Sequence, residues 1–291
     1  MKQLNYQPNE MARSLSKQQS NIIGLIVPHI THPHFAKMIH AIEKAASRNN
    51  YRILLFSTSY KDKKEEKYIE MCQSNRVAGV ILCNGALNAE KLTNLGCPVI
   101  TIDHSTSAGT ASVECDNYQG GVLATQHLID QGCRHLIHLA GIPDEIMPGD
   151  ERIQAFIDIC EKNGAAHHEF ASPTSYDEAD YYAMIEQILV QHPDTDGIFA
   201  SSDVLAAQVI QVCHHRGIQI PQQMKIVGFD DVNIAAFTYP ELTTIHQPVE
   251  QMAEAAVSFL VQALSGSVVA AKTMFPVSLV VRNSTEADGK E

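Results

Sequence analysis

Short apolar runs rich in β-branched residues alternate along the chain with longer segments whose apolar residues recur at helical spacing. The short runs predict strands at Ile22–Val27, Arg52–Ser57, Gly79–Cys83, Pro98–Ile102, His135–Ala140, Gly197–Ala200 and Lys225–Phe229. The longer segments predict helices around Phe35–Ala46 and at Lys61–Ser74, Ala89–Leu95, Tyr118–Gln131, Asp150–Lys162, Tyr176–Gln191, Val204–Arg216 and Val249–Leu264. Strands that alternate with helices form a parallel sheet covered on both faces.

This strand–helix series occurs twice, and 291 residues are enough for two lobes of ordinary size. We therefore expect an α/β fold of two doubly wound parallel-sheet lobes with a cleft between them. Ligands of such sheets bind at the carboxyl ends of the strands. The residues that follow the predicted strands are His32–Phe35, Ser57, Cys83–Asn84, Asp103, Ser202–Asp203 and Asp230.

The first 20 residues differ from the rest because they are polar and carry no strand pattern. Pro8 is followed by Asn9, a residue that often caps a helix, and Leu15 lies about two turns further on. A helix this short is marginal in water, so we expect it to form only when a partner holds it.

Composition narrows the class of protein. Hydrophobic residues make up 45% and charged residues 19%, values typical of a soluble globular protein. Neither a signal-peptide core nor an apolar run of ~20 residues is present, which predicts a cytoplasmic protein with no membrane partner. The seven cysteines are dispersed and predict reduced thiols. A net charge of -12 argues against a large nucleic-acid surface, so any DNA contact must come from a small segment or an absent one.

The sequence carries no motif for nucleotide binding or hydrolysis, and we expect no cofactor and no catalytic residue. Adjacent residues such as Asp230 and Asp231 normally point apart, which disfavours paired acid–base catalysis. The spacing His29-x-x-His32-x-His34 is compatible with a metal, but a structural site wants four ligands, so a pocket-lining loop is the preferred interpretation and no metal is expected.

Two further residues each have two interpretations on sequence alone. Arg152 lies in the first turn of its predicted helix, where the helix dipole does not favour a cation. It is either a solvated surface residue or a cleft residue whose planar fork binds two sugar hydroxyls. Asp230 ends an apolar strand and is either a loop cap or an acceptor for vicinal hydroxyls.

Several stretches together, in order along the chain, resemble the lactose-repressor (LacI/GalR) family of bacterial transcription regulators. They are Leu4-Asn5-Tyr6-x-Pro8-Asn9-x-x-Ala12-Arg13-x-Leu15, Ile23–Val27, Arg76-Val77-x-Gly79-Val80-Ile81, Val113-x-x-Asp116-Asn117-x-x-Gly120-Gly121, Val227–Asp231 and Pro240-x-Leu242-Thr243-Thr244-Ile245-x-Gln247-Pro248. Within the family, the opening segment and residues 120–125 look most like sucrose-type operon repressors.

The resemblance implies a periplasmic-binding-protein-like fold of type I and a homodimer. Its three crossovers divide the chain into an N-terminal lobe of residues 21–117 and 247–275 and a C-terminal lobe of residues 118–246 and 276–291. Residues 1–20 correspond to the hinge and linker, and the helix-turn-helix that precedes it in the family is absent. The hinge residues that would enter the DNA minor groove are Asn9, Ala12, Arg13 and Leu15, with Leu15 as the wedge between base pairs.

The resemblance also implies a set of effector contacts. They are Phe35, Asp103, Arg152, Tyr176, Asp230 and Gln247, together with two positions that depart from the family pattern. Ser202 stands where the family has Asn, and His34 lies in a loop that is usually Asn-Pro-Phe-Phe. Both departures lie in the expected pocket, so the ligand can differ from that of well-known members.

The resulting hypothesis is a repressor of a carbohydrate-utilisation operon that responds to a sugar or sugar phosphate and binds operator DNA. An effector would shift a two-state equilibrium that changes the spacing of two hinge segments, by induction or by co-repression. The main alternative is a sugar-binding protein of a transport system, which shares the fold but has no use for residues 6–15. A sugar-modifying enzyme is a weaker alternative, because no catalytic constellation appears.

Overall fold

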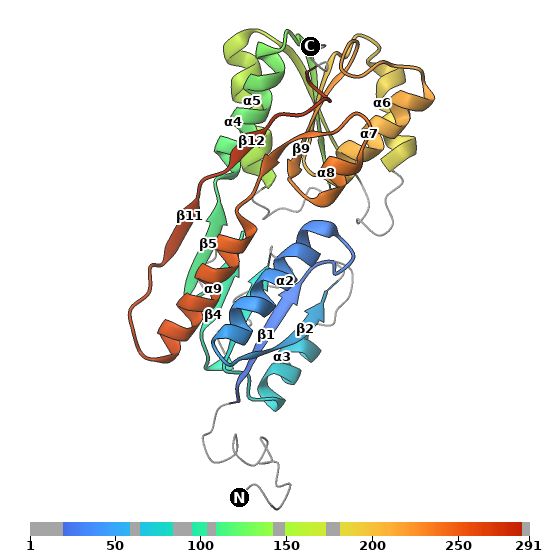
Figure 1. Cartoon of the computed structure of the whole chain (residues 1–291). Helices are drawn as coiled ribbons and strands as arrows, with labels where there is room; N and C mark the ends of the chain where they lie inside the picture. Colours follow the sequence, from blue (N-terminus) through green and yellow to red (C-terminus); the bar gives the residue numbers. More distant parts are fainter. Residues whose placement is uncertain are drawn as a thin grey trace, which may run out of the picture. The chain divides into compact units, whose positions relative to one another are not determined.

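The computed structural model describes residues 20–58, 65–83, 95–103, 109–141, 149–172 and 181–286 (Figure 1). The chain divides into two compact units, each with its own sheet. Unit 1 holds the described residues up to Glu114 together with Val249–Thr273, and unit 2 holds Cys115–Pro248 together with the described residues from Met274. Among the described helices, none combines the length and the apolar character that a membrane crossing requires.

Unit 1 is built on a sheet with the strand order β11-β5-β4-β3-β1-β2. Its strands are β1 (Ile22–Val27), β2 (Arg52–Ser57), β3 (Gly79–Cys83), β4 (Val99–Ile102), β5 (Ala111–Cys115) and β11 (Lys272–Phe275). The central strand β1 runs parallel to β2 and β3, with Ile23 opposite both Ile53 and Gly79. From Ile23 onward β1 is buried along its length, as expected for a parallel strand covered on both faces.

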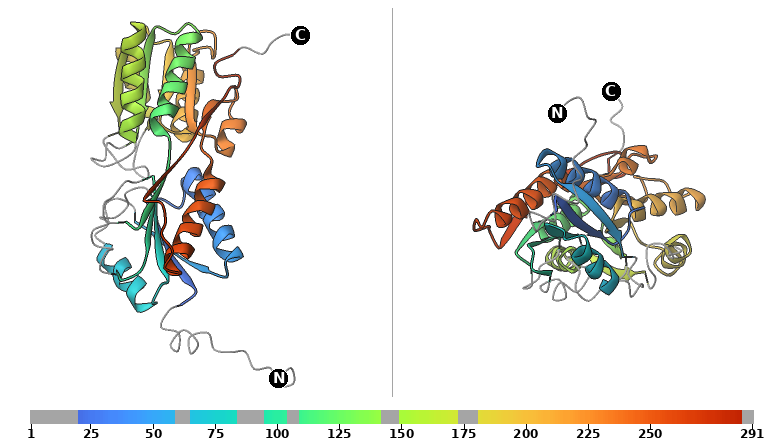
Figure 2. Two further views of the ribbon diagram at one scale, coloured as in Figure 1. Left: turned by 90° about the vertical axis from the view of Figure 1, so that its left-hand side faces the viewer. Right: turned by 90° about the horizontal axis from the view of Figure 1, so that it is seen from below.

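Helices α2 (Pro33–Arg48) and α9 (Val249–Leu264) pack together on one face of this sheet, and α3 (Glu65–Ser74) covers the other (Figure 2). Pro33 starts α2, a position where the missing N–H of proline costs nothing. His32 caps the helix, because its Nδ1 accepts a hydrogen bond of 3.3 Å from the backbone N–H of His34.

Unit 2 is built on a second sheet, with the strand order β12-β10-β9-β8-β6-β7. Its strands are β6 (His135–Ala140), β7 (Ala166–Ala171), β8 (Gly197–Ala200), β9 (Lys225–Asp230), β10 (Thr243–His246) and β12 (Ser278–Val280). Helices α4 (Asn117–Asp130) and α5 (Gly149–Asn163) cover one face, while α6 (Tyr181–Gln191) and α7 (Asp203–His215) cover the other (Figure 1). The short helix α8 (Asn233–Phe237) packs beside α7. All described pairings are parallel except that of β10 with β12.

The two doubly wound parallel sheets confirm the predicted fold class. The division between the units falls at residues 114/115, 248/249 and 273/274, two or three residues from each expected boundary. Gln247, expected in the N-terminal lobe, consequently belongs to unit 2. The hinge positions Asn9, Ala12, Arg13 and Leu15, the helix expected at Ala89–Leu95 apart from its last residue, and Tyr176 lie outside the described residues.

Candidate functional site

The side chain of Arg152, in the first turn of α5, is held from three directions. Its Nε donates a hydrogen bond of 2.8 Å to Oδ1 of Asn117, and its Nη1 donates one of 2.8 Å to the backbone oxygen of Ser201. Its guanidinium carbon lies 3.5 Å from the ring centre of Phe229. Arg152 is therefore not a solvated surface residue, and its planar group is fixed in one orientation.

Two of the three groups that hold Arg152 come from carboxyl ends of strands in the unit 2 sheet, the edge at which α/β sheets bind ligands. Ser201 follows β8 directly, and Phe229 is the penultimate residue of β9. Asn117, the third group, opens helix α4, which packs on the same sheet.

Two adjacent glycines of α4 allow this arrangement. A Cβ atom on Gly120 would lie 2.7 Å from the ring of Phe229, and one on Gly121 would lie 2.7 Å from the backbone oxygen of Arg152. Any larger residue would push α4 away from α5 or from β9. The glycines thus set how deeply Arg152 reaches toward the sheet edge.

Asp230 ends β9 next to the Arg152 cluster, with a positive φ of 115° that a residue with a side chain rarely adopts. Oδ1 of Asp230 accepts a hydrogen bond of 2.7 Å from Nε2 of Gln247. Both side chains are buried, and among the described residues Oε1 of Gln247 has no hydrogen-bond partner. A buried acceptor without a donor is costly unless a ligand supplies one.

The neighbouring carboxylates have structural partners of their own. Asp203 accepts hydrogen bonds from the backbone N–H of Val232 and from the hydroxyl of Thr244, and its burial raises its pKa to about 7 although both hydrogen bonds oppose this shift. Asp231 contacts Arg282 at 2.7 Å and His246 at 2.8 Å. Its burial opposes ionisation, but the hydrogen bonds and charges of these two partners prevail and lower its pKa. Asp230 and Asp231 therefore do not form a carboxylate pair.

Ser202 occupies a capping position rather than an open one. Its hydroxyl accepts a hydrogen bond of 3.3 Å from the backbone N–H of Leu205 and caps α7. The half-buried side chain lies between Ser201, which holds Arg152, and the buried Asp203. Ser202 thus belongs to the same strand end as the Arg152 cluster.

Unit 1 has its own group of strand-end residues. His34 and Phe35 are buried at the start of α2, with their ring centres 5.3 Å apart in an edge-to-face arrangement. Burial, aided by the nearby His29, lowers the pKa of His32 to about 4. At neutral pH His32 is therefore an uncharged imidazole. Among the described residues, no three His, Cys, Asp or Glu side chains are placed to hold a metal ion.

Asp103 follows β4 and is also buried, with a positive φ of 49°. It lies beside Cys83 at the end of β3, and burial together with the charge of Asp103 raises the pKa of that thiol. Asp103 and Asp230 are thus two aspartates in strained backbone conformations, each at the end of a strand in its own unit.

Of the predicted contacts, the structure brings Arg152, Ser202, Asp230 and Gln247 to one edge of the unit 2 sheet, and it places His34, Phe35 and Asp103 at strand ends of unit 1. Sequence reasoning missed Asn117, Ser201 and Phe229 as the groups that orient Arg152. Asn117 and Phe229 stand in motifs that carried the family resemblance, and Ser201 follows a predicted strand. The position of each residue in the sequence could therefore have marked it as part of the site.

Residues 125–285 match the family described as periplasmic binding protein-like domain. The chain is 33% identical to the ribose operon repressor of Halalkalibacterium halodurans over 98% of this chain and 86% of that protein. It is 32% identical to the sucrose operon repressor of Pediococcus pentosaceus over 96% of this chain and 86% of that protein. A solved periplasmic binding protein/LacI transcriptional regulator from Alkaliphilus metalliredigens, complexed with D-xylulofuranose, matches with a TM-score of 0.81 and 30% identity, covering 92% of this chain and 100% of that one.

These relatives are named as operon repressors and regulators, which supports a transcription regulator rather than a transport protein. The two sequence identities are nearly equal, so they do not distinguish a sucrose-type from a ribose-type repressor. The chain belongs to the LacI/GalR family of transcriptional repressors and contains their periplasmic-binding-protein-like effector-binding core.

Proposed function

We propose that the chain is the effector-binding and dimerisation core of a sugar-responsive repressor that acts on operator DNA in the bacterial cytoplasm. The observation that carries this proposal is the fixed fork of Arg152 close to the buried pair of Asp230 and Gln247. All three belong to the carboxyl edge of the unit 2 sheet.

The chemistry of this group suits a polyhydroxylated ligand. Within the described part of the chain, Nη2 of Arg152 donates no hydrogen bond, so it can donate to a ligand oxygen. The carboxylate of Asp230 can accept from vicinal hydroxyls, and Oε1 of Gln247 can accept from a third. Donors and acceptors fixed in this way discriminate strongly against a ligand that lacks the matching hydroxyl.

We favour a pentose or pentulose over a larger sugar or a sugar phosphate. Support comes from two relatives of 30% identity or more, one named for the ribose operon and one solved with D-xylulofuranose. The relative named for the sucrose operon points to a larger sugar, so sucrose is the competing ligand. His34, Phe35, Asp103, Ser202 and Tyr176 are proposed as further contacts to the same effector.

The proposed mechanism couples the effector to the segment before Ser20. Asn9, Ala12, Arg13 and Leu15 would form a short helix in the minor groove, paired with its copy from a second protomer, while a helix-turn-helix supplies the major-groove contacts. The effector acts by binding one of two core states more tightly than the other.

Calorimetric titration with ribose, xylulose, sucrose and the corresponding sugar phosphates tests this proposal. Arg152→Lys retains the charge but loses the fork, and Asp230→Asn removes the anion. We expect each variant to lower the affinity by roughly tenfold to 100-fold, since hydrogen bonds to charged groups contribute about 1.5–3 kcal/mol.

Two exposed residues, Arg216 and Asp194, provide matched controls. Arg216→Lys and Asp194→Asn should leave the titration unchanged. Circular dichroism establishes that all four variants are folded. If the two site variants bind as tightly as the controls, the assignment of the site is wrong, and if no sugar or sugar phosphate binds the wild-type chain, the sugar-responsive function is wrong.

A further inference from the structure

The turn after α3 contains an arginine in a conformation that suits glycine. Arg76 has a φ of 48°, in the left-handed region. Its backbone N–H donates to the oxygen of Gln73 at 2.9 Å, and that of Val77 donates to the oxygen of Cys72 at 3.1 Å. These two hydrogen bonds close a Schellman motif, in which the left-handed position usually holds glycine.

Five other helices in the described part of the chain end in a left-handed residue, and none of them uses a long side chain there. After α4, α5, α7 and α9 the residue is glycine, and after α2 it is asparagine, the residues being Gly132, Gly164, Gly217, Gly266 and Asn50. Arg76 is therefore an exception to the way this chain closes its helices. Backbone strain retained at one position points to a function of that side chain.

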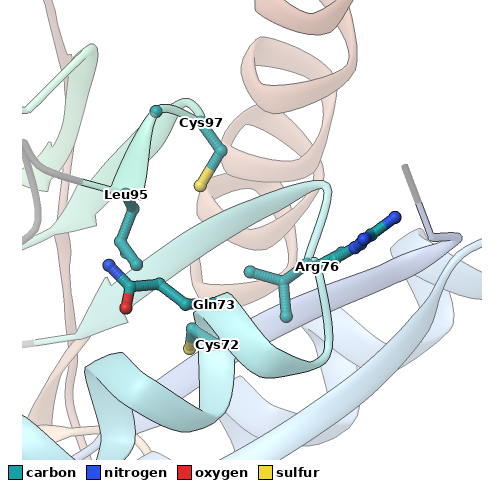
Figure 3. A pocket seen from close by; sticks show the side chains of 7 residues that line it. Cys72, Gln73, Arg76, Leu95 and Cys97 are labelled. Carbon is teal, nitrogen blue, oxygen red and sulfur yellow. The ribbon is translucent and has the colours of Figure 1, made fainter. Parts of the chain in front are cut away.

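The backbone of Arg76 anchors the point at which the N-terminal segment joins the core. Its carbonyl oxygen accepts hydrogen bonds from Ser20, at 3.2 Å from the backbone N–H and 2.7 Å from the hydroxyl. The side chain is exposed, and no ion pair to it is found within the described residues. Figure 3 shows it extended away from Leu95 and Gln73.

The edge of the unit 1 sheet at which Arg76 lies contains no acidic residue in its described loops. These loops are 20–21, 49–51, 75–78, 95–98, 109–110 and 265–271. Glu254 of α9 is paired with Arg48 at 2.7 Å. In a chain with a net charge of -12, an edge whose described loops present Arg76 and contain no carboxylate suits a polyanionic partner.

We propose that Arg76 binds the phosphate backbone of operator DNA beside the segment that enters the minor groove. The inference rests on the proposed operator-binding function and extends it from residues 9–15 to the core. Ser20 lies five positions after Leu15, a separation of at most about 18 Å when the chain is fully extended. Ser20 is hydrogen-bonded to Arg76, so a hinge bound in the groove brings the guanidinium close to the flanking phosphates.

Arg76 also lines a hollow of about 430 Å³, whose other lining residues are uncharged: Cys72, Gln73, Val77, Leu95, Gly96 and Cys97 (Figure 3). A small anion in this hollow is the competing explanation for an arginine here. The direction of the side chain favours the DNA, because the guanidinium extends away from the hollow rather than into it.

The test uses the full chain joined behind a helix-turn-helix head and a duplex that this protein selects from a random pool. Binding is measured by fluorescence anisotropy as a function of salt concentration for the wild type, Arg76→Gln, Arg76→Lys and Arg76→Gly. Each lost phosphate contact reduces the slope of log affinity against log salt by about 0.9, so a complex with two protomers should lose about 1.8 with Gln or Gly. Lys should retain the slope.

Arg216→Gln removes the same charge at the end of α7 in unit 2 and should leave the slope unchanged. Arg76→Gly should also raise the midpoint of urea unfolding, because it relieves the backbone strain while weakening DNA binding, a combination that a purely structural role would not give. Titration with inorganic phosphate in the absence of DNA tests whether the hollow binds a small anion.

The outcomes separate the two proposals. If the wild type binds its duplex but Arg76→Gln has an unchanged slope, the inference about Arg76 is wrong while the operator-binding function stands. Phosphate binding that is lost in Arg76→Gln, with an unchanged slope on DNA, assigns the side chain to the hollow instead. If the wild type selects no duplex, both the operator-binding function and this inference are overturned.

Discussion

At the scale of single residues, the buried His138, which lies within reach of the charge of Arg152, is expected to destabilise the folded protein. This residue of β6 is fully buried between Phe156 and Phe199, with ring centres 5.5 and 4.9 Å away. Both ring nitrogens lack a hydrogen-bond partner among the described residues. Burial, with a smaller contribution from the charge of Arg152, lowers the pKa of His138 to about 3.

Replacing His138 by leucine should stabilise the protein, because two unsatisfied polar atoms leave the core. We expect the free energy of unfolding at pH 7.5 to rise by about 1–3 kcal/mol. Urea unfolding followed by circular dichroism measures this change. The exposed His40 on α2 provides the control, and His40→Gln should have no effect. A loss of stability in His138→Leu comparable to that of a cavity mutant would show that the imidazole makes a favourable contact.

The low pKa of His138 also predicts how the stability of the protein depends on pH. The folded state holds His138 neutral down to about pH 3, whereas the unfolded chain binds a proton below about pH 6.5. The wild type should therefore lose stability as the pH falls from 6.5, with a limiting slope of about 1.4 kcal/mol per pH unit from this group. His138→Leu should lose less between pH 7.5 and pH 5, and parallel profiles for the two proteins would refute the assignment.

Sequence reasoning reached the chemical residues of the site but not their supports. Asp230 and Gln247 could be named because they stand in family motifs, and Arg152 because it opens a predicted helix and matches an effector contact of the family. The acceptors of Arg152 are 35 and 49 residues away in the sequence, and only the packing of α5 against α4, which in turn contacts β8, brings them together. Positive φ angles such as that of Asp230 leave no pattern in the sequence at a residue other than glycine or asparagine.

At the scale of elements, the central strands and long helices were predictable because their burial follows from their position. Ile22–Val27, Gly79–Cys83 and Val249–Leu264 have the predicted bounds. The missed strands are β5, β7, β10, β11 and β12. The edge strand β7, Ala-His-His-Glu-Phe-Ala, is mostly exposed and has no apolar run, since its pairing with β6 rather than its hydrophobicity defines it.

The close approach of α4 and α5 leads to a prediction for Gly121. A methyl group there would lie 2.7 Å from both Cβ of Ala155 and the backbone oxygen of Arg152. Both atoms are fixed to the backbone of α5, so they can move aside only if the helix itself shifts. Gly121→Ala should lower the free energy of unfolding by about 1–3 kcal/mol and weaken effector binding, because α5 carries Arg152 with it. Chemical denaturation and calorimetric titration measure the two effects.

Gly141 provides the matched control, because a Cβ atom on it would meet no described residue within 4 Å. Gly141→Ala should retain the stability and affinity of the wild type. If Gly121→Ala behaves like this control, the helix contact does not position Arg152.

At the scale of the whole molecule, the sequence specifies two units joined by three chain crossings, and the charge is distributed unequally around unit 1. The buried Glu114, next to one crossing, pairs with Lys272 at 2.6 Å, next to another. This pair keeps a carboxylate and an ammonium together within unit 1. An acidic chain can therefore serve a DNA-binding protein, because the described loops at the edge that carries Arg76 contain no carboxylate.

The proposed homodimer predicts that an exposed apolar surface of unit 2 is covered in solution. Phe237 is 80% exposed at the end of α8 and Tyr239, two residues later, is 94% exposed, unusually large aromatic surfaces to leave in water. The double variant Phe237→Ser/Tyr239→Ser should shift sedimentation velocity from a dimer to a monomer, while the effector titration of each protomer is retained. Val268 is 97% exposed in a loop of unit 1, and Val268→Ser should remain dimeric. A dimer that survives the double variant would place the interface elsewhere, and a monomeric wild type would contradict the proposed assembly.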